Sequence, residues 1–324
     1  MRKCIDSLLV GGDDVEVIIV NDGSKDDTPL IAAEYAEKYP SIVKVVNKEN
    51  GGHGSGINAG LGLATGLYFK VVDSDDWLDG DALKELLATI KTHSETGELP
   101  DLYITNFVYS KVGDGDYVSS YETKMPVRKM MGWKSVKKFT YSHMLLMHAL
   151  MYKRDKLVES GLHLPEHTFY VDNIFAYQPL PHMRRLYYLD VNLYYYFIGR
   201  DDQSVNKKNF LARYEQQLRV MRCMIDAHAM NDINELPRGL KRYMRHALNV
   251  IMIVSVFFTG AECSPERKKA LADLWQYLKS KDKKMYKFLR WHSYATFAYL
   301  FGWRVRGKVM TQFYDHYCST VHLG

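Results

Sequence analysis

Three short apolar runs open the chain, at residues 15–20, 42–46 and 68–72, and each is rich in valine, isoleucine or aromatic side chains. Runs of this length and composition predict buried strands. Between the first two, residues 30–38 have the apolar spacing of a helix, and Pro29 stands where a first helical turn accepts proline. Strand, helix and strand in this order predict a β-α-β unit with parallel pairing, and therefore an α/β fold.

The pattern changes near residue 205. Before it, strands and helices alternate; after it, four segments have helical spacing, namely residues 210–229, 238–258, 265–279 and 283–301. The sequence therefore predicts two domains, an α/β domain over residues 1–205 and a helical region over residues 206–324. The longest apolar run, residues 250–259, is too short to cross a bilayer and predicts a buried helix.

The third predicted strand ends in three carboxylates within four residues, Asp73, Asp75 and Asp76. Like charges this close repel one another, and a cation relieves the repulsion. Mg²⁺ and Mn²⁺ take carboxylate oxygens and complete their shells with water and substrate phosphates. The loop therefore predicts a metal that holds a phosphate ester, although a solvated acidic turn has the same composition.

Asp22 ends the first predicted strand, and a glycine-rich segment, residues 50–60, follows the second. Ligands of open parallel sheets bind beyond the carboxyl ends of the strands, so Asp22 and Asp73 are expected to face one crevice. Five glycines in the segment allow close backbone approach, and the amides of a following helix favour an anion. The pattern is neither a dinucleotide fingerprint nor a P-loop, and the alternative interpretation is a flexible turn.

The order of these motifs resembles the family 2 glycosyltransferases. The motifs are a strand ending in Asn-Asp-Gly-Ser at residues 21–24, an Asn-Ala-Gly triplet at residues 58–60, and a strand ending in Asp-Ser-Asp-Asp-Trp at residues 73–77. The resemblance implies a GT-A fold, a Rossmann-like, mainly parallel mixed sheet flanked by helices. It also implies an inverting enzyme that uses a nucleotide-diphosphate sugar.

The resemblance assigns roles to individual residues. Asp22 matches the aspartate that contacts the uracil of the donor, Asp73 the one near the ribose, and Asp75 the ligand of Mn²⁺ or Mg²⁺, with Asp73 beside it. Asp76 is an additional acidic residue without a defined role. Asn58 matches an asparagine of the donor site, but Ile57 replaces the arginine that precedes it in relatives.

Inverting transfer needs a general base for the acceptor hydroxyl. Residues 171–175 resemble the family's Glu-Asp-x-x-Phe stretch, in which the aspartate is the base, and this assigns the role to Asp172. Capping the next helix is its alternative role, and Glu166 and His167 are rival bases. His143 and His148 are expected either to line the acceptor side of the site or to lie in the core. Arg200 is expected either to contact the diphosphate or to lie on the surface.

Relatives begin with a strand that starts the sheet and lines the nucleotide pocket, whereas residues 1–9 look like the helix that follows that strand. We therefore expect the first strand to be missing from this chain. A non-catalytic nucleotide-sugar-binding or partner subunit with a degenerate fold is the alternative function. A nucleotidyltransferase is disfavoured because it would need a basic glycine-rich loop near the N-terminus.

Composition adds little to this picture except in the last third of the chain. The net charge of +5 does not imply nucleic acid, and four scattered cysteines suit free thiols in a reducing cytoplasm. Cationic residues gather late beside aromatic ones, at Lys279, Lys281, Lys283, Lys284, Lys287, Arg290, Arg304, Arg306 and Lys308. Such a region suits an anionic membrane surface, where lipid-linked glycan acceptors reside, or a solvated basic face.

Overall fold

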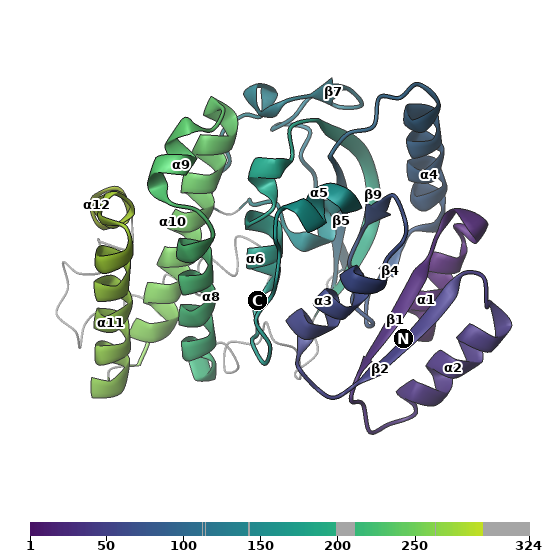
Figure 1. The fold of residues 1–324 in the computed structure, drawn as a ribbon, viewed down its shortest axis with the longest axis horizontal. Coiled ribbons are helices and arrows are strands. Elements are labelled where there is room, and N and C mark those ends of the chain that lie inside the picture. Colours follow the sequence, from purple (N-terminus) through teal and green to yellow (C-terminus); the bar gives the residue numbers. More distant parts are fainter. Residues whose placement is uncertain (112, 114, 142, 199–210, 263, 294–324) are drawn as a thin grey trace. The chain divides into compact units, whose positions relative to one another are not determined.

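The computed structural model describes the chain except residues 112, 114, 142, 199–210, 263 and 294–324. It divides into two compact units, residues 1–137 with 145–198, and residues 138–144 with 199–324. The N-terminal unit contains strands and helices, and the described part of the other unit is helical (Figure 1). Arg200 and the last basic residues of the sequence lie outside the described residues.

Two parallel strands begin the N-terminal unit, β1 (Val17–Asp22) and β2 (Val43–Lys48), and α2 (Thr28–Lys38) connects them. This confirms the predicted β-α-β unit. Alternate residues of β1 face opposite sides, as the period of a strand requires. Val17 packs in a small core with Ile5 of α1 (Arg2–Leu9) and Tyr35 of α2. On the other side, Val20 packs against α3 (His53–Leu63).

β1 and β2 form a sheet of their own, and among the described residues no strand pairs with the second edge of β1. Parallel sheets are usually covered on both faces and paired along their edges. Whether another segment pairs with this edge of β1 is outside the residues that the structure describes.

The larger sheet has seven strands in the order β3-β8-β5-β9-β4, with β6 beside β5 and β7 beside β9. Its strands are β3 (Tyr68–Phe69), β4 (Trp77–Leu78), β5 (Leu102–Lys111), β6 (Gly115–Ser119), β7 (Met130–Met131), β8 (Leu150–Lys153) and β9 (Leu186–Ile198). β5 and β9 run parallel through the buried centre, and the other described pairs of this sheet are antiparallel. The sheet is mixed, as expected, with a smaller parallel share than the sequence suggested.

The remaining helices of this unit are short apart from α4 (Gly80–Glu95), which Asp79 caps through the amides of Asp81 and Ala82. The others are α5 (Arg154–Glu159), α6 (Asp172–Tyr177) and single turns at Gly12–Asp14, Trp133–Ser135, Met147–Ala149 and Leu180–His182.

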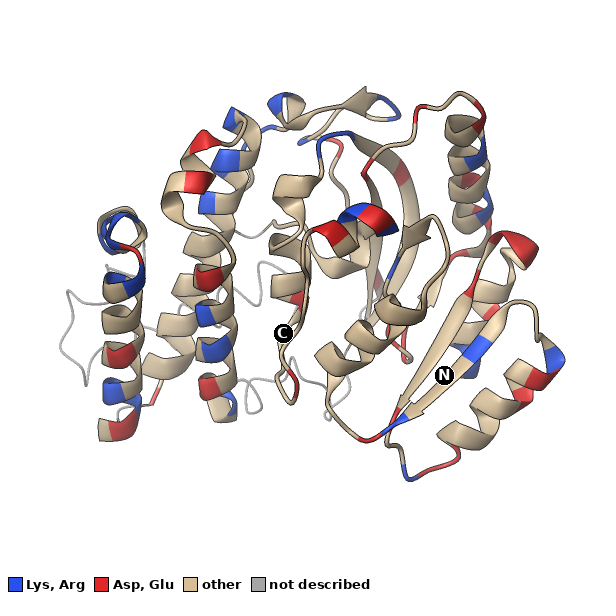
Figure 2. Cartoon of the chain, in the orientation of Figure 1, with Lys and Arg blue, Asp and Glu red and all other residues tan. Residues whose placement is uncertain are grey.

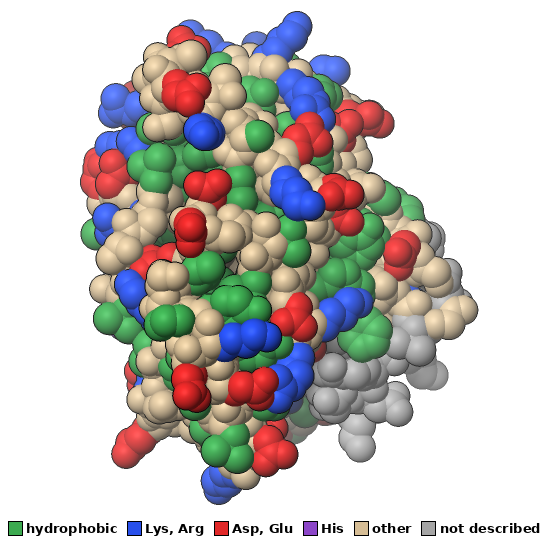
Figure 3. All heavy atoms as spheres, turned by 90° about the vertical axis from the view of Figure 1, so that its right-hand side faces the viewer, with side chains coloured by type: hydrophobic (Ala, Val, Ile, Leu, Met, Phe, Trp, Pro, Cys, Tyr) green, Lys and Arg blue, Asp and Glu red, His purple; other side chains and the backbone are tan. Residues whose placement is uncertain are grey.

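On the face shown in Figure 3, Lys and Arg alternate with Asp and Glu. No single-sign field suited to nucleic acid stands out on that face.

The helical unit contains α8 (Tyr214–Ala227), α9 (Met230–Glu235), α10 (Arg238–Gly260), α11 (Pro265–Lys281) and α12 (Lys283–Trp291). Each of the four predicted helices is found, but the first ends at Ala227 and the last at Trp291, before the predicted ends that the structure describes, and α9 was not predicted. α10 is long and apolar enough to cross a membrane by length and composition alone. However, 78% of its apolar window is buried within the structure, as expected for a core helix.

Candidate active site

The site is built on the loop between β3 and β4, residues 70–76. β3 is anchored to β8 and β4 to β9, so both ends of the loop are fixed in the sheet. The predicted strand over residues 68–72 is wrong after Phe69, because Lys70 turns inward and its Nζ donates to the carbonyl oxygen of His148 at 2.6 Å. A turn then closes with the Asp76 amide donating to the Asp73 carbonyl at 3.0 Å. The three carboxylates are therefore held on a short, tethered loop.

Asp73 faces a histidine that the sequence analysis did not assign. His53 opens α3, and its Nε2 lies 3.0 Å from Asp73 Oδ1. Burial opposes a charge on His53, but attraction from Asp73, Asp172 and Asp75 outweighs it and raises the pKa to about 9. Burial opposes the charge on Asp73 as well, but the His53 partner keeps its pKa below the ordinary value. The only imidazole in the glycine-rich segment was the sequence signal for this pair.

Asp76 is buried, with 1% of its surface exposed. Its Oδ2 accepts from the hydroxyl of Tyr194 at 2.5 Å, and its Oδ1 accepts from the amide of Phe197 at 2.8 Å. Burial and the nearby Asp73 charge raise the pKa of Asp76 to about 8. Tyr194 also accepts from the amide of Asp73 at 3.2 Å. One tyrosine of β9 therefore ties both aspartates to the central sheet.

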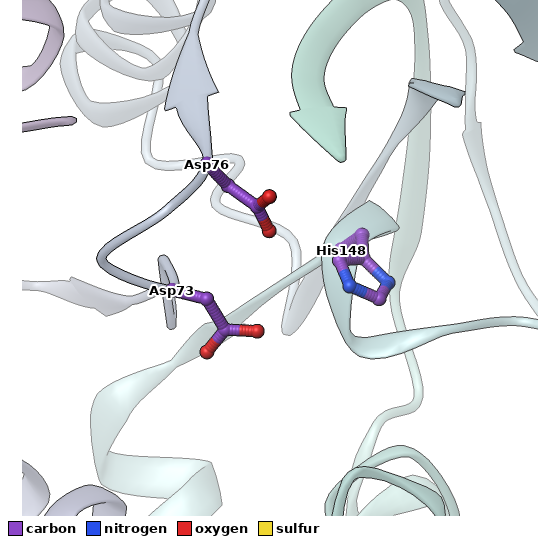
Figure 4. A group of neighbouring side chains, drawn as sticks. All are labelled: Asp73, Asp76 and His148. Atoms are coloured by element: carbon purple, nitrogen blue, oxygen red, sulfur yellow. The ribbon is translucent and has the colours of Figure 1, made fainter. Parts of the chain in front are cut away.

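His148 completes a group that could hold a cation. One atom each of Asp73, Asp76 and His148 lie within 4.8 Å of one another, and the group does not include Asp75. Figure 4 shows these three side chains. Burial lowers the pKa of His148 to about 4, so the imidazole is neutral, as a metal ligand must be. Carboxylate oxygens and an imidazole nitrogen fit a first-row divalent ion. Of the two expected roles, the structure gives His148 a buried position.

Asp22 ends β1 as predicted, but its carboxylate is occupied by the protein. Oδ1 accepts from Lys48 Nζ at 2.8 Å and from the Gly51 amide at 2.9 Å, and Oδ2 accepts from the Gly52 amide at 2.7 Å. Burial opposes its charge, yet these donors outweigh burial and lower the pKa of Asp22. Asp22 therefore holds the start of the glycine-rich segment, and His53 extends that same segment to Asp73. The segment therefore connects the end of β1 with the acidic loop.

The side chain of Asn58 is also hydrogen-bonded within the protein. Its Nδ2 donates to the carbonyl of Leu164 at 2.8 Å, and its Oδ1 accepts from the Leu164 amide at 3.0 Å. A Cβ at Gly54 would stand 2.8 Å from the Pro165 carbonyl, which only glycine avoids. Part of the glycine-rich segment thus serves close packing against residues 164–168 of the protein itself, an outcome that composition alone did not reveal.

Asp172 is the first residue of α6, and Val171 is the residue before the helix, so the capping interpretation is wrong. Burial raises the pKa of Asp172; the nearby His53 opposes this rise, and the Asp73 charge adds to it. Asp172 and Asp73 therefore share His53 as a neighbour. A carboxyl with a raised pKa beside the acidic loop has the properties of a general base.

The rival residues have other contacts. Glu166 accepts from the hydroxyl of Ser55 at 3.1 Å, and the His167 amide donates to the Gly51 carbonyl at 2.6 Å. His167 has a positive φ of 47°, an uncommon conformation for a residue with a side chain. His143 belongs to the helical unit, where its ring lies 5.8 Å from Phe139. The predicted contact of Arg200 with a diphosphate lies outside the described residues.

Comparisons with known proteins give a family similarity and a similar fold. Residues 1–155 match the model of the family described as "Glycosyl transferase family 2". "Putative glycosyltransferase EpsH" of Bacillus subtilis (strain 168) is 32% identical over 233 residues, which are 66% of this chain and 63% of EpsH. "Minor teichoic acid biosynthesis protein GgaB" of the same strain is 33% identical over 96 residues, 29% of this chain and 11% of GgaB. The chain thus spans less than two thirds of either relative.

A crystal structure of S. aureus TarS residues 1–349 in complex with UDP-GlcNAc has the same fold. It aligns with a TM-score of 0.59 and 21% identity, and covers 95% of this chain and 86% of that one. The mixed sheet and its flanking helices form an α/β fold of the GT-A type, as in TarS, and helices follow it toward the C-terminus. Residues 1–155 are therefore similar in sequence to glycosyl transferase family 2.

Proposed function

We propose that the protein is an inverting glycosyltransferase that moves one sugar from a nucleotide-diphosphate sugar to a glycan or lipid-linked acceptor. UDP-sugars are the expected donors, and cell-surface polysaccharide synthesis is the expected process. The observation that carries the proposal is that His53, whose Nε2 lies 3.0 Å from Asp73 Oδ1 in the acidic loop, is also close enough to Asp172 for their charges to interact. Support also comes from the names of EpsH and GgaB and from the UDP-GlcNAc bound to TarS.

The proposal divides the work among residues of the N-terminal unit. Asp73 and Asp75 would hold Mn²⁺ or Mg²⁺, and the group around His148 offers further ligand atoms. Such a cation, when bound, offsets the charge of the departing diphosphate. Asp22 and Asn58 would shape the nucleotide side, since both fix the segments that border it. Asp172 would take the proton of the acceptor hydroxyl, and Arg200 would contact the diphosphate.

We further propose a cytoplasmic protein that contacts the inner face of the cell membrane. The described part of the basic region lies on α11 and α12, where Figure 2 marks Lys and Arg. Lys283, Lys284, Lys287 and Arg290 share α12, and Trp291 at its end is 71% exposed. An exposed indole beside cationic side chains suits a membrane interface. Such a contact would bring the protein to lipid-linked acceptors.

A donor screen tests the proposed reaction. Nucleoside diphosphate release is measured from a panel of UDP-, GDP- and TDP-sugars with Mn²⁺, with and without membrane lipid extract as acceptor source. Extract-dependent release from one donor, abolished by Asp75→Ala and by EDTA, is expected. Asp81→Asn, whose side chain is 97% exposed, is the matched control. Nucleotide binding without release from any donor would instead identify the non-catalytic binding subunit.

A further inference from the structure

Three tyrosines form a row across the larger sheet of the N-terminal unit. Tyr117 of β6 lies opposite Tyr109 of β5, and Tyr109 lies opposite Tyr196 of β9. Side chains of paired residues share one face of a sheet and lie close enough to interact. The ring centroids are 6.4 Å apart between Tyr117 and Tyr109, and 5.8 Å apart between Tyr109 and Tyr196. The three rings therefore form one continuous feature, which we call the tyrosine row.

The inner end of the tyrosine row lies at the proposed active site. The ring of Tyr196 stacks on that of His148, with centroids 4.3 Å apart. Burial raises the pKa of the Tyr196 hydroxyl well above its ordinary value, and the charges of Asp73, Asp76 and Asp172 raise it further. The effect of a charge on another group falls off with distance. Tyr196 is therefore a neighbour of both the acidic loop and the proposed base, Asp172.

The outer end of the tyrosine row lies at the rim of the sheet. Among the described strands β6 pairs with β5 alone, and Tyr117 is 48% exposed. Tyr109, between the two ends, is 8% exposed, so it supports the neighbouring rings and offers little surface of its own. An exposed tyrosine presents an apolar ring face and a polar hydroxyl at its tip. It therefore suits a partner that is apolar on one side and polar at its edges.

A sugar unit is a partner of this kind. Its C–H groups form an apolar face that stacks on an aromatic ring, while the hydroxyls around that face keep polar partners. The proposed reaction brings an acceptor hydroxyl to Asp172, and the next unit of a glycan acceptor then lies further out. The tyrosine row leads from the neighbourhood of Asp172 to the rim, in steps close to the length of one sugar unit. Its position therefore fits a chain of sugars that enters from the rim.

We propose that Tyr196 and Tyr117 form two acceptor subsites, with Tyr196 beside the sugar unit that reacts and Tyr117 beside a unit further along the same glycan. The inference rests on the proposed function and deepens it, because it makes the acceptor a glycan of at least two sugar units. Tyr117 determines specificity in this account, since it contacts the acceptor and not the atoms that react.

The test measures glycan binding without catalysis. Protein with UDP and Mn²⁺ is applied to an array of bacterial cell-surface sugars, from single units to longer oligosaccharides, and the bound ones are titrated in solution. Tyr117→Ile keeps a residue suited to a strand but removes the ring face, and should weaken binding of oligosaccharides about three- to tenfold. Tyr117→Phe keeps the face and should bind like the wild type. Val118→Ala, the next residue of the same edge strand and 42% exposed, is the matched control on the opposite face.

Thermal melting checks that each variant folds. If Tyr117→Ile does not, nitration of the wild type by tetranitromethane decides, because a bound oligosaccharide should protect Tyr117. Absence of binding to every oligosaccharide overturns the inference, as does equal binding by the wild type and Tyr117→Ile, or an equal loss in Val118→Ala. A loss as large for single sugars as for longer chains also overturns it, since the outer subsite contacts only the longer ones.

Donor turnover, measured separately, distinguishes this inference from the proposed function. Oligosaccharide binding that depends on Tyr117, without release of nucleoside diphosphate from any donor, would reject the transferase and retain the glycan site. Transfer to an acceptor at equal rates and equal half-saturating acceptor concentrations in the wild type and Tyr117→Ile would retain the transferase and reject the outer subsite.

Discussion

Two aspartates of the N-terminal unit, one at the end of β1 and one in the loop between β3 and β4, have opposite electrostatic environments. Asp22, at the end of β1, accepts from Lys48 and from two amides, and its pKa is lowered. Asp76, in the loop after β3, lies beside Asp73, and burial with that like charge raises its pKa to about 8. One carboxylate is neutralised by the protein, whereas the other lacks a described cationic partner.

This difference separates two kinds of aspartate that look alike in sequence. One kind stabilises the fold, and the other is available to bind a ligand. Donors from the protein keep a carboxylate ionised and fixed, and such a residue stabilises the fold. Carboxylates that face each other favour a bound cation or a proton. Asp22 therefore holds the glycine-rich segment in place, while the loop of residues 73–76 has the electrostatics of a ligand site. The following predictions test this division, beginning with the largest effect.

Asp172 is one of the aspartates that we propose to take part in the reaction, and its replacement should have the largest effect on turnover. Asp172→Asn keeps the shape but cannot take a proton, and we expect turnover to fall about 10²–10⁴-fold. Nucleotide affinity should stay within a factor of about two, because the residue is proposed to serve the acceptor. Steady-state kinetics beside calorimetry with UDP measures both. Normal turnover with weakened UDP binding would place Asp172 on the donor side instead.

Asp22→Asn should destabilise the fold, since it removes charge from three hydrogen bonds that join β1, Lys48 and the glycine-rich segment. Hydrogen bonds to a charged group predict a loss of about 2–3 kcal/mol in the free energy of unfolding. Urea denaturation measures it, with the exposed Asp81→Asn as control. If Asp22→Asn unfolds like the wild type but loses nucleotide affinity, the residue is a ligand contact and the comparison fails.

Gly54→Ala tests the packing of α3 against the loop before Asp172. The added Cβ would stand 2.8 Å from the Pro165 carbonyl and 2.9 Å from Leu164 Cβ, so the loop must shift. We expect a loss of about 1–2 kcal/mol in urea denaturation. The matched control is Gly62→Ala in the same helix, where nothing lies within 4 Å and helix propensity should add about 0.5 kcal/mol. Equal effects of the two changes would disprove the close approach.

The smallest effect is the pH dependence of the Asp22 clamp. A lowered pKa means that its stabilisation is complete above the ordinary value of 3.8 and is lost as the pH falls through the folded-state value below it. The stability difference between wild type and Asp22→Asn should therefore be constant from pH 7 to pH 5 and shrink toward pH 3. Urea midpoints at stepped pH measure this. A difference that stays the same at pH 3 would show that charge is not involved.

Local patterns were sufficient for much of the fold. The apolar runs at residues 15–20 and 42–46, with Pro29 opening the helix between them, identified the β-α-β unit, because strand and helix periods are local properties. Residues 68–72 were misjudged as one strand, since only tertiary contacts reveal that Lys70 leaves the sheet to bond with the His148 carbonyl. The central parallel pair of β5 and β9 joins segments far apart in the chain, which periodicity does not detect.

The candidate site was predictable in its aspartates and not in their partners. Asp22, Asp73 and Asp172 stand next to strand or helix ends, so motif order located them. His53 and Tyr194 were missed, because their roles depend on contacts across 20 and 118 or more residues of sequence. The hydrogen bond between Asn58 and Leu164 was not predicted either, because the two residues are 106 positions apart in the sequence. Sequence identified the residues that carry charge, and the fold determines which charges are already compensated.

The most direct measurement of the central claim is calorimetry of UDP binding with and without Mn²⁺, for the wild type, Asp73→Asn and Asp22→Asn at a temperature where all are folded. If the acidic loop is the ligand site and Asp22 a structural clamp, UDP binds the wild type and Asp22→Asn only with Mn²⁺, and Asp73→Asn at least about tenfold more weakly. UDP binding of equal strength in EDTA and to Asp73→Asn would contradict the account.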